Sequence, residues 1–336
     1  MKNVLVTGGA GFIGSNFINY ILSKRNDYFI VNLDKLTYAG NLENLKTSEG
    51  NENYRFIKGD ICNDELVKYV FENFNIDYVI NFAAESHVDR SILGSGIFYR
   101  TNVLGTNVLL EISKEFGIKK FLQISTDEVY GSLGKEGKFT EQTCLSPNSP
   151  YASSKAAADL MCLSFYHTYG LPVVITRCSN NYGPYQFPEK LIPLMIINSL
   201  NNKKLPVYGD GLNIRDWIYV IDHNKAVELV FEEGKIGEVY NIGASSEKRN
   251  IEIVKLILKH LNKSEDLIQY VQDRLGHDRR YAIDSSKIQN ELGWRPSFEF
   301  ENAISKTIDW YLQTREWWQR IISGEYKDYY QMQYKM

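Results

Sequence analysis

The start of the chain constrains the fold most, because a glycine-rich turn joins an apolar run to a helical segment. Residues 3–7 read as a buried strand, glycines follow at positions 8, 9, 11 and 14, and a helix is expected to run to about Lys24. The glycines fit both GxGxxG and GxxGxxG. Such a turn lets the backbone approach a pyrophosphate closely, and the helix N-terminus adds unpaired N–H groups. The pattern predicts a dinucleotide site, with a tight turn that binds nothing as the alternative.

The second predicted strand ends in an acid that suits the same ligand. Residues 29–33 read as a strand, and Asp34 follows twenty residues after Gly14. A carboxylate at this distance can bind ribose hydroxyls, and it would repel a 2′-phosphate. We therefore expect NAD rather than NADP, although the neighbouring Lys35 weakens the preference slightly.

Strands and helices alternate as far as residue 178. Strands are predicted at 54–60, 77–83, 120–124 and 172–178, and helical segments at 64–74, at 98–116 and from residue 150 onward. This alternation implies a parallel sheet with right-handed crossovers. We expect an α/β fold: a Rossmann-type doubly wound parallel sheet with a smaller, interleaved α/β substrate-binding lobe.

The pattern becomes irregular after residue 178. Short strands are expected at 205–208, 215–219 and 238–242, and helices at 251–261, 285–292 and 301–314. Residues 1–178, with return segments at about 210–245, are assigned to an NAD-binding Rossmann domain. The substrate-binding lobe is assigned to 179–209 and 246–322, and an aromatic C-terminal tail to 323–336.

The composition argues against several kinds of partner. A formal net charge of −3 leaves no basic excess for nucleic acid or an anionic membrane. No apolar run approaches the roughly 18 residues of a membrane span, and the N-terminus lacks the pattern of a signal peptide, so we expect a cytoplasmic protein. The four cysteines are far apart with no histidine at ligand spacing, which indicates reduced thiols and no metal site.

Two adjacent carboxyl groups follow the strand at 120–124. Asp127 and Glu128 lie in the segment 125–131, Ser-Thr-Asp-Glu-Val-Tyr-Gly. Ligands of open α/β sheets bind just outside the carboxyl ends of the strands, so we expect acid–base chemistry here. Solvated loop charges are the ordinary alternative, because carboxylates are mostly exposed.

A tyrosine and a lysine one helical turn apart form the other half of the predicted site. Tyr151 and Lys155 open a helix after Pro150, and on a helix their side chains are neighbours. The ammonium group would favour the phenolate and make Tyr151 a base for a sugar hydroxyl; a structural tyrosine is the alternative. The same spacing at 20/24 and 54/58 falls on the first helix and on a strand, so those pairs are set aside.

Two loops are further candidates for ligand contacts. In segment 83–91 the two alanines would let a cofactor pass closely and Ser86 suits a phosphate or sugar hydroxyl, whereas His87 is expected to be structural. Segment 273–281 is basic and contains glycine, which suits a diphosphate, with an ordinary charged loop as the alternative. Asp60, at a strand end, could contact adenine.

Together these motifs resemble the extended short-chain dehydrogenase/reductase family, and within it the nucleotide-sugar 4,6-dehydratases. The resemblance runs from residue 3 to about 320 and rests on segments 7–14, 33–42, 83–91, 125–131, 180–193 and 273–281 and on the Tyr151/Lys155 pair. Its most specific parts are the Thr-Asp-Glu triplet and the arginine-containing loop. Leu275 stands where some relatives carry proline, and this departure affects the shape expected for that loop.

The resemblance implies conversion of dTDP-glucose to dTDP-4-keto-6-deoxyglucose, for deoxysugar biosynthesis of the rhamnose type. Tyr151 would take the proton of the 4-hydroxyl while hydride passes from C4 to NAD. Glu128 would remove the C5 proton and Asp127 would protonate the departing C6 hydroxyl, after which the hydride returns to C6. The family also implies a homodimer formed through the helices around 98–116 and 150–169.

The resemblance also carries the expected residue roles. The catalytic residues are Asp127, Glu128, Tyr151, Lys155 and Thr126. Of these, Thr126 would polarise the 4-hydroxyl region. The NAD-binding residues are Gly8, Gly11, Phe12, Ile13, Gly14, Asp34, Lys35, Leu36, Thr37, Asp60, Ile61, Phe82, Ala83, Ala84, Ser86, Thr101, Tyr151, Lys155 and Asn181. The nucleotide-sugar contacts are Ser86, Thr126, Asn180, Lys190, Leu191, Pro206, Val207, Tyr208, Arg215, Asn250, Asp273, Arg274, Leu275, Gly276 and His277.

Three alternatives stay open. One is a 4,6-dehydratase that acts on a UDP-sugar. Another is a related epimerase, which would carry small residues in place of Asp127 and Glu128, or a decarboxylase, which would carry a non-acid at position 127. The third is an NAD-binding module without catalysis, against which the complete set of catalytic residues argues.

Overall fold

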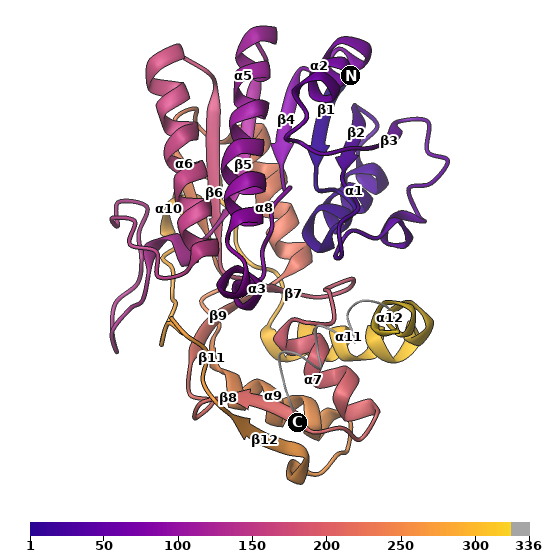
Figure 1. The fold of residues 1–336 in the computed structure, drawn as a ribbon, viewed down its shortest axis with the longest axis vertical. Coiled ribbons are helices and arrows are strands. Elements are labelled where there is room, and N and C mark those ends of the chain that lie inside the picture. The colour runs from indigo at the N-terminus through magenta and orange to yellow at the C-terminus, as the bar shows by residue number, and fades with distance from the viewer. Residues whose placement is uncertain (324–336) are drawn as a thin grey trace.

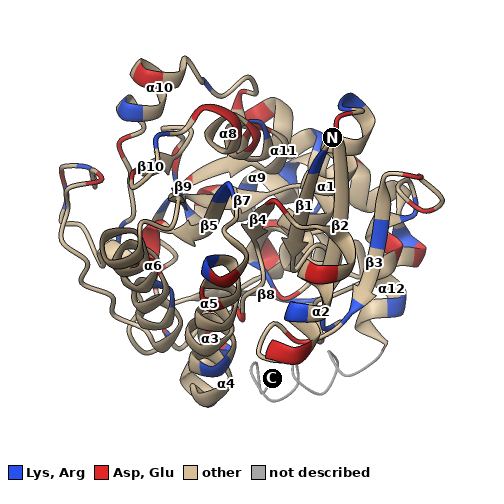
Figure 2. Ribbon diagram, turned by 90° about the horizontal axis from the view of Figure 1, so that it is seen from above, with Lys and Arg blue, Asp and Glu red and all other residues tan. Residues whose placement is uncertain are grey.

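The computed structural model describes residues 1–323 and shows a large parallel sheet above a smaller group of strands and helices (Figure 1). The predicted tail at 323–336 lies outside the described residues except for Ser323. No helix within residues 1–323 is both long and apolar enough to span a membrane. Basic and acidic residues are interspersed along the ribbon (Figure 2), in keeping with the small net charge.

The large sheet has seven strands in the order β10-β6-β5-β4-β1-β2-β3, and all neighbouring pairs are parallel. The strands are β1 (Lys2–Thr7), β2 (Tyr28–Asp34), β3 (Tyr54–Lys58), β4 (Tyr78–Asn81), β5 (Lys120–Thr126), β6 (Val173–Cys178) and β10 (Val239–Ile242). The strand order reverses between β1 and β4, which is the Rossmann arrangement and marks where ligands bind. The predicted fold class is confirmed.

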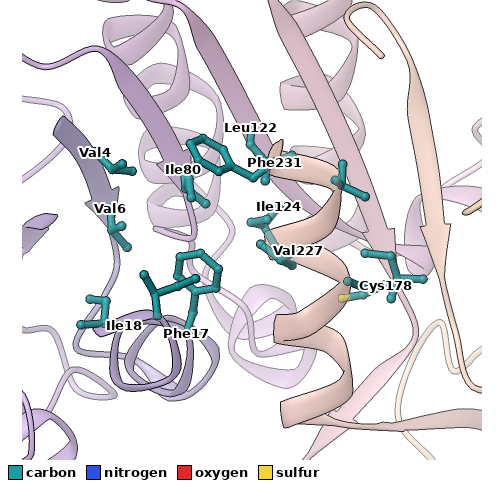
Figure 3. Packing of buried hydrophobic residues seen from close by; sticks show 14 of the residues in the cluster. Val4, Val6, Phe17, Ile18, Ile80, Leu122, Ile124, Cys178, Val227 and Phe231 are labelled. Atoms are coloured by element: carbon teal, nitrogen blue, oxygen red, sulfur yellow. The ribbon is translucent and has the colours of Figure 1, made fainter. Parts of the chain in front are cut away.

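Helices cover both faces of this sheet, and its central strands are therefore apolar on both sides. One face packs against α1 (Phe12–Lys24), α8 (Val220–Glu233) and α10 (Ser286–Leu292). The other packs against α2 (Asp64–Phe74), α5 (Thr106–Phe116) and α6 (Pro150–Tyr169). Figure 3 shows the first face, where Val4 and Val6 of β1 point toward Phe17 of α1; Leu5, between them, belongs to the core on the second face, as strand alternation requires.

The smaller group of elements has its own core, built from the C-terminal half of the chain. A three-stranded sheet joins β11 (Glu247–Arg249), β9 (Ile214–Tyr219) and β7 (Asn180–Tyr182), and a two-stranded sheet joins β12 (Ile268–Val271) and β8 (Leu205–Tyr208). Around them pack α7 (Leu191–Leu200), α9 (Asn250–His260), α11 (Phe300–Gln313) and α12 (Arg315–Ile322). The division of the chain into a cofactor lobe and a substrate lobe at the predicted boundaries stays a proposal.

Several elements differ from the prediction. The single helix expected at 98–116 is α4 (Gly96–Phe98), a π-helical turn at Tyr99–Gly105 and α5, and residues 88–93 form helix α3 rather than a loop. The helices α7, α8 and α12 were not predicted. In α7 nearly every side chain is buried, so its sequence lacks the polar face by which an amphipathic helix is recognised.

Candidate active site

Two joined cavities lie at the carboxyl ends of the large sheet. The larger has a volume of about 300 Å³ and runs from the glycine turn past the ends of β2, β4 and β5. The smaller, about 160 Å³, lies against α7, β8 and β9. Their common wall is formed by Ser86, Glu128, Asn180, Asn181, Gln186, Glu189 and Lys190. A ligand in one cavity can therefore meet a ligand in the other at Glu128.

The glycine turn forms one end of the larger cavity. Gly8 has φ +68°, and a Cβ added to it would lie 2.6 Å from the backbone N and Cα of Ala83. Gly8, Gly11 and Gly14 line the cavity, whereas Gly9 packs against Asn32. Of the two glycine patterns that fit the sequence, GxxGxxG is thus the one that faces a ligand.

The first turn of α1 offers N–H groups to this cavity. The residue before the helix is Gly11, so no side chain caps the first N–H groups of α1. Phe12 and Ile13 of this turn line the cavity. Unpaired N–H groups at a helix N-terminus bind phosphate. Buried oxygens without a hydrogen-bond partner among the described residues also line the cavity, including Ser125 Oγ and Asn181 Oδ1. The residues present therefore fit a dinucleotide.

The acid after β2 is fixed by backbone hydrogen bonds. Asp34 Oδ2 accepts from the Ala10 N–H (2.9 Å), and Asp34 Oδ1 accepts from the Leu36 N–H (2.7 Å). Lys35 Nζ lies 2.8 Å from Asp60 Oδ2, so its charge is paired and does not offset Asp34. Among the predicted cofactor contacts, Leu36 does not line the cavity: its backbone, at φ +55°, turns so that its N–H donates to Asp34. A contact of Leu36 with the cofactor stays a proposal.

The carboxyl pair sits on a short 3-10 turn, Asp127–Tyr130, directly after β5. Thr126 Oγ1 accepts a hydrogen bond from the Glu128 N–H and donates one to Asp127 Oδ1, both at 3.3 Å. Gly131 ends the turn with φ +88° and lies against Ser146. Asp127 is only 1% exposed, which excludes the alternative of a solvated loop charge.

The surroundings of Asp127 and Glu128 affect the pKa values of the two carboxyl groups differently. Burial raises the pKa of Asp127 well above its usual value, and the neighbouring Glu128 charge adds to this increase. Burial also raises the pKa of Glu128, but Arg274, Arg215 and Lys190 oppose the increase. Asp127 is therefore the group that keeps a proton and Glu128 the group that ionises, although the titration belongs to the pair.

The tyrosine and lysine of α6 lie in the wall of the larger cavity. The helix begins at Pro150 after Ser149, whose Oγ accepts from the Ala152 N–H at 3.1 Å. Lys155 Nζ donates to the Ile124 carbonyl at 2.6 Å. Neither the 20/24 pair nor the 54/58 pair lines either of these two cavities.

The ionisation of Tyr151 differs from the prediction. The sequence predicted that Lys155 favours the phenolate. Instead, burial raises the pKa of Tyr151 well above its usual value and Glu128 adds to the increase, while the Thr126 hydroxyl opposes it. Burial also lowers the pKa of Lys155. Within the protein alone, the phenol form of Tyr151 is therefore favoured.

The smaller cavity carries three cationic side chains, Lys190, Arg215 and Arg274. Lys190 Nζ donates to the Ser86 carbonyl at 3.1 Å, and Arg215 Nη2 donates to the Asp278 carbonyl at 2.9 Å. Arg274 Nη1 lies 3.4 Å from Asp89 Oδ1. Cations from three separate segments suit a diphosphate.

Only part of the 273–281 loop reaches this cavity. Arg274 and His277 line it, whereas Arg279 pairs with Asp210 and Arg280 with Glu247. Three predicted substrate contacts do not line either cavity. Asp273 bonds to His277, Leu275 is 76% exposed, and Gly276 lies against Asn148. All the other predicted substrate contacts line one cavity or both.

Several cavity residues were not predicted. They are Leu33, Tyr38, Ala39, Gly40, Gly59, Glu85, Ile124, Ser125, Cys178, Ser179, Gln186, Phe187 and Glu189 in the larger cavity and His87, Val88, Asp89, Leu194, Met195 and Trp217 in the smaller. Some lie in quoted motifs and could have been found there, such as Tyr38 in segment 33–42. Others, such as Trp217, lie on strands whose pairing the sequence does not reveal.

The fold and the joined cavities define a Rossmann-type enzyme with sites for a dinucleotide and for a second, anionic ligand. The chain belongs to the family described as GDP-mannose 4,6 dehydratase, whose model matches residues 5–307. It is 52% identical to a dTDP-glucose 4,6-dehydratase of Xanthomonas campestris pv. campestris, over 97% of this chain and 98% of that protein.

Two crystal structures agree with this assignment. The dTDP-glucose 4,6-dehydratase of Bacillus anthracis, in complex with NAD, has a TM-score of 0.90 and 53% identity, over 96% of this chain and 100% of that one. The dTDP-glucose 4,6-dehydratase of Streptomyces venezuelae, with NAD and TYD bound, has a TM-score of 0.92 and 46% identity, over 95% and 99% of the two chains.

Proposed function

We propose that this protein is an NAD-dependent hydro-lyase that converts dTDP-glucose to dTDP-4-keto-6-deoxyglucose, a precursor of deoxysugars. The observation that carries the proposal is the pair Asp127 and Glu128 on the wall of the larger cavity, with Glu128 shared by both cavities. One keeps a proton and the other ionises, and loss of water needs an acid and a base at once. The relatives named above are enzymes of this activity.

The larger cavity would hold NAD, with Gly8, Gly11 and Gly14 at the pyrophosphate and Asp34 at the adenosine ribose. When bound there, NAD would supply the acceptor for the hydride of C4 and the donor of hydride to C6, and its positive charge would favour the phenolate of Tyr151. Lys155, fixed on the Ile124 carbonyl, would orient the neighbouring groups.

The side chains would then move protons in order. Tyr151 accepts the proton of the 4-hydroxyl, whose oxygen Thr126 orients. Glu128 accepts the C5 proton, which the new ketone has made acidic. Asp127 donates its proton to the C6 hydroxyl, which leaves as water. When the hydride returns to C6, C5 takes up a proton again. The net change is loss of one water molecule.

The smaller cavity would hold the nucleotide diphosphate. Lys190, Arg215 and Arg274 would bind the phosphates, and Asn250, whose Oδ1 is buried without a partner among the described residues, would accept a hydrogen bond from the nucleotide. The predicted contacts at Asp273, Leu275 and Gly276, which lie beside Arg274 on the same loop but do not line the cavity, stay proposals.

Incubation of the purified protein with dTDP-glucose, UDP-glucose or UDP-N-acetylglucosamine, followed by mass measurement, tests the proposal. We expect dTDP-glucose to lose one water molecule with the highest kcat/KM. Conversion of a substrate to its epimer at unchanged mass would indicate an epimerase, and loss of carbon dioxide from UDP-glucuronic acid, added as a fourth substrate, would indicate a decarboxylase. A tenfold preference for a UDP-sugar, about 1.4 kcal/mol of transition-state binding, would overturn the choice of base.

We further propose a cytoplasmic homodimer. Apolar side chains stand exposed along the segment from α3 to α6, of which α5 and α6 lie side by side in Figure 1: Leu93, Ile97, Tyr99, Leu104, Phe116, Leu160 and Tyr169. Such a patch is typical of a subunit interface. Replacing Leu104 and Leu160 by Glu should give monomers in light scattering, whereas Tyr270→Glu on β12 should leave the dimer intact; a monomeric wild type would contradict the proposal. Cell fractionation tests the location.

A further inference from the structure

Three side chains from separate segments meet beside the larger cavity. Tyr38 follows β2, Arg90 lies in α3, and Glu189 precedes α7. Tyr38 Oη donates to Glu189 Oε1 at 2.9 Å, and Arg90 Nε lies 2.8 Å from Glu189 Oε2. The Arg90 guanidinium also stacks 3.8 Å from the centre of the Tyr38 ring. Tyr38 and Glu189 both line the cavity, so the cluster connects two parts of its wall.

Glu189 is the buried centre of the cluster, and Tyr38 and Arg90 are partly exposed around it. The Glu189 side chain is only 2% exposed, and each of its carboxylate oxygens has a partner. The Phe187 ring packs edge-on against Tyr38 with centroids 5.3 Å apart, and Ala39 and α12 complete this contact. A buried carboxylate that loses a partner is costly, so the three side chains hold one arrangement.

Both ends of the cluster are tied to the glycine turn and its helix. On the Tyr38 side, the Asn41 N–H and Asn44 Nδ2 donate to the Ala10 carbonyl at 3.0 and 3.1 Å. On the Glu189 side, Asn16 Nδ2 of α1 donates to the Pro184 carbonyl at 3.0 Å. The Tyr38–Glu189 bond therefore closes a loop of contacts around the part of the cavity that fits the pyrophosphate.

We propose that Tyr38, Arg90 and Glu189 form a strap that retains NAD in the larger cavity throughout the catalytic cycle. The inference rests on the proposed function, in which hydride removed from C4 must return to C6 of the same sugar. If the reduced cofactor dissociated between the two transfers, the 4-keto intermediate would have no hydride to receive. The strap residues are positioning residues, since they act on retention and not on the reacting atoms.

If the strap retains NAD, its residues should control the rate at which bound NAD leaves the protein when no sugar is present. Tyr38→Phe and Glu189→Gln keep the side-chain shapes but remove the hydrogen bond or the charge. We expect bound NAD to exchange with labelled NAD at least tenfold faster in each variant, and less NAD to remain after purification. Exchange at the wild-type rate would overturn the proposal.

A matched cluster at the other end of β2 supplies the control. Tyr28 and Lys2 bond to Glu232 there, which repeats the tyrosine–glutamate–cation chemistry far from the cavity wall. Tyr28→Phe and Glu232→Gln should leave NAD exchange unchanged. Equal acceleration in these controls would show that general loosening, not the strap, governs retention.

Turnover gives a second readout that structural damage would not produce. The strap variants should lose activity progressively during turnover of dTDP-glucose and regain it when NAD is added, whereas wild type should keep its activity. Inactivation that added NAD does not reverse would contradict the strap. A wild type that holds NAD but leaves dTDP-glucose unchanged would refute the proposed substrate, and the exchange rates would still decide the strap.

Discussion

Gly8→Ala tests whether the close approach of the glycine turn to β4 builds the cofactor cavity. At φ +68°, an alanine costs about 1–2 kcal/mol of backbone strain. Its Cβ would also lie 2.6 Å from backbone atoms of Ala83, which cannot rotate aside as a flexible side chain could. Overpacking of this kind costs about 1–3 kcal/mol. The two terms together predict a loss of about 2–5 kcal/mol in the free energy of unfolding.

The same substitution at Gly170 separates the two terms. Gly170 ends α6 with φ +70°, and an added Cβ would have no atom within 4 Å. Gly170→Ala should therefore cost only the strain, about 1–2 kcal/mol. Urea unfolding of both variants without cofactor measures the difference, and NAD content after purification measures the effect on the cavity.

In Gly8→Ala, the backbone of Ala83 must move to make room for the added Cβ, and Ala83 lines the cavity. Gly8→Ala should therefore retain much less NAD, while Gly170→Ala should retain as much as wild type. If Gly8→Ala were no less stable than Gly170→Ala and kept its NAD, the close approach would not be needed, and the reasoning about the turn would be wrong.

Three further substitutions test titratable and charged groups, one in the smaller cavity and two in the core of the fold. Arg274→Gln should raise the pKa of Glu128, because Arg274 opposes the effect of burial, and should move the acidic limb of the pH profile of kcat to higher pH; an unshifted limb would argue against Glu128 as the base. His223 is buried and its pKa falls from 6.5 to about 3. Below pH 6.5 the unfolded chain therefore binds a proton at His223 that the folded protein does not, so the free energy of unfolding should fall as pH decreases from 6.5 toward 3. Urea titrations at several pH values should show a smaller dependence of this free energy on pH in His223→Asn than in wild type. An equal dependence in the two proteins would contradict this. Arg177→Met should lower the free energy of unfolding by about 3–5 kcal/mol, since it leaves the Asp159 carboxylate buried without its cation; a loss below about 1 kcal/mol in urea unfolding would contradict this.

The sheet and the positions of the main motifs could be predicted because local signals carry them. Buried parallel strands are short apolar runs, and the carboxyl end of each run is the edge where ligands bind. That rule placed Asp127 near the cofactor cavity from sequence alone. It could not show that Asp127 is 1% exposed, because burial depends on elements from the far half of the chain.

Other features depend on tertiary contacts and could not be predicted. The pKa of Tyr151 is set mainly by burial, so the spacing of Tyr151 and Lys155 gave the wrong direction for the free protein. Tyr38 and Glu189 are 151 positions apart, and nothing in either segment predicts their bond. The loop at 273–277 was assigned as one ligand-binding unit, whereas only Arg274 and His277 of it line the cavity and Leu275 is exposed.

In the proposed mechanism, Tyr151 and Lys155 serve oxidation at C4, while Asp127 and Glu128 serve the loss of water. Asp127→Asn combined with Glu128→Gln keeps the side-chain volumes but removes the acid and the base, each of which typically contributes about 10²–10⁴-fold. Rapid mixing of this double variant with dTDP-glucose should give a stable rise in reduced-nicotinamide absorbance and a 4-keto sugar nucleotide that can be trapped, whereas Tyr151→Phe should give neither. A double variant that shows no reduced cofactor, or that still forms the 6-deoxy product at nearly the wild-type rate, would contradict the assignment of the two pairs.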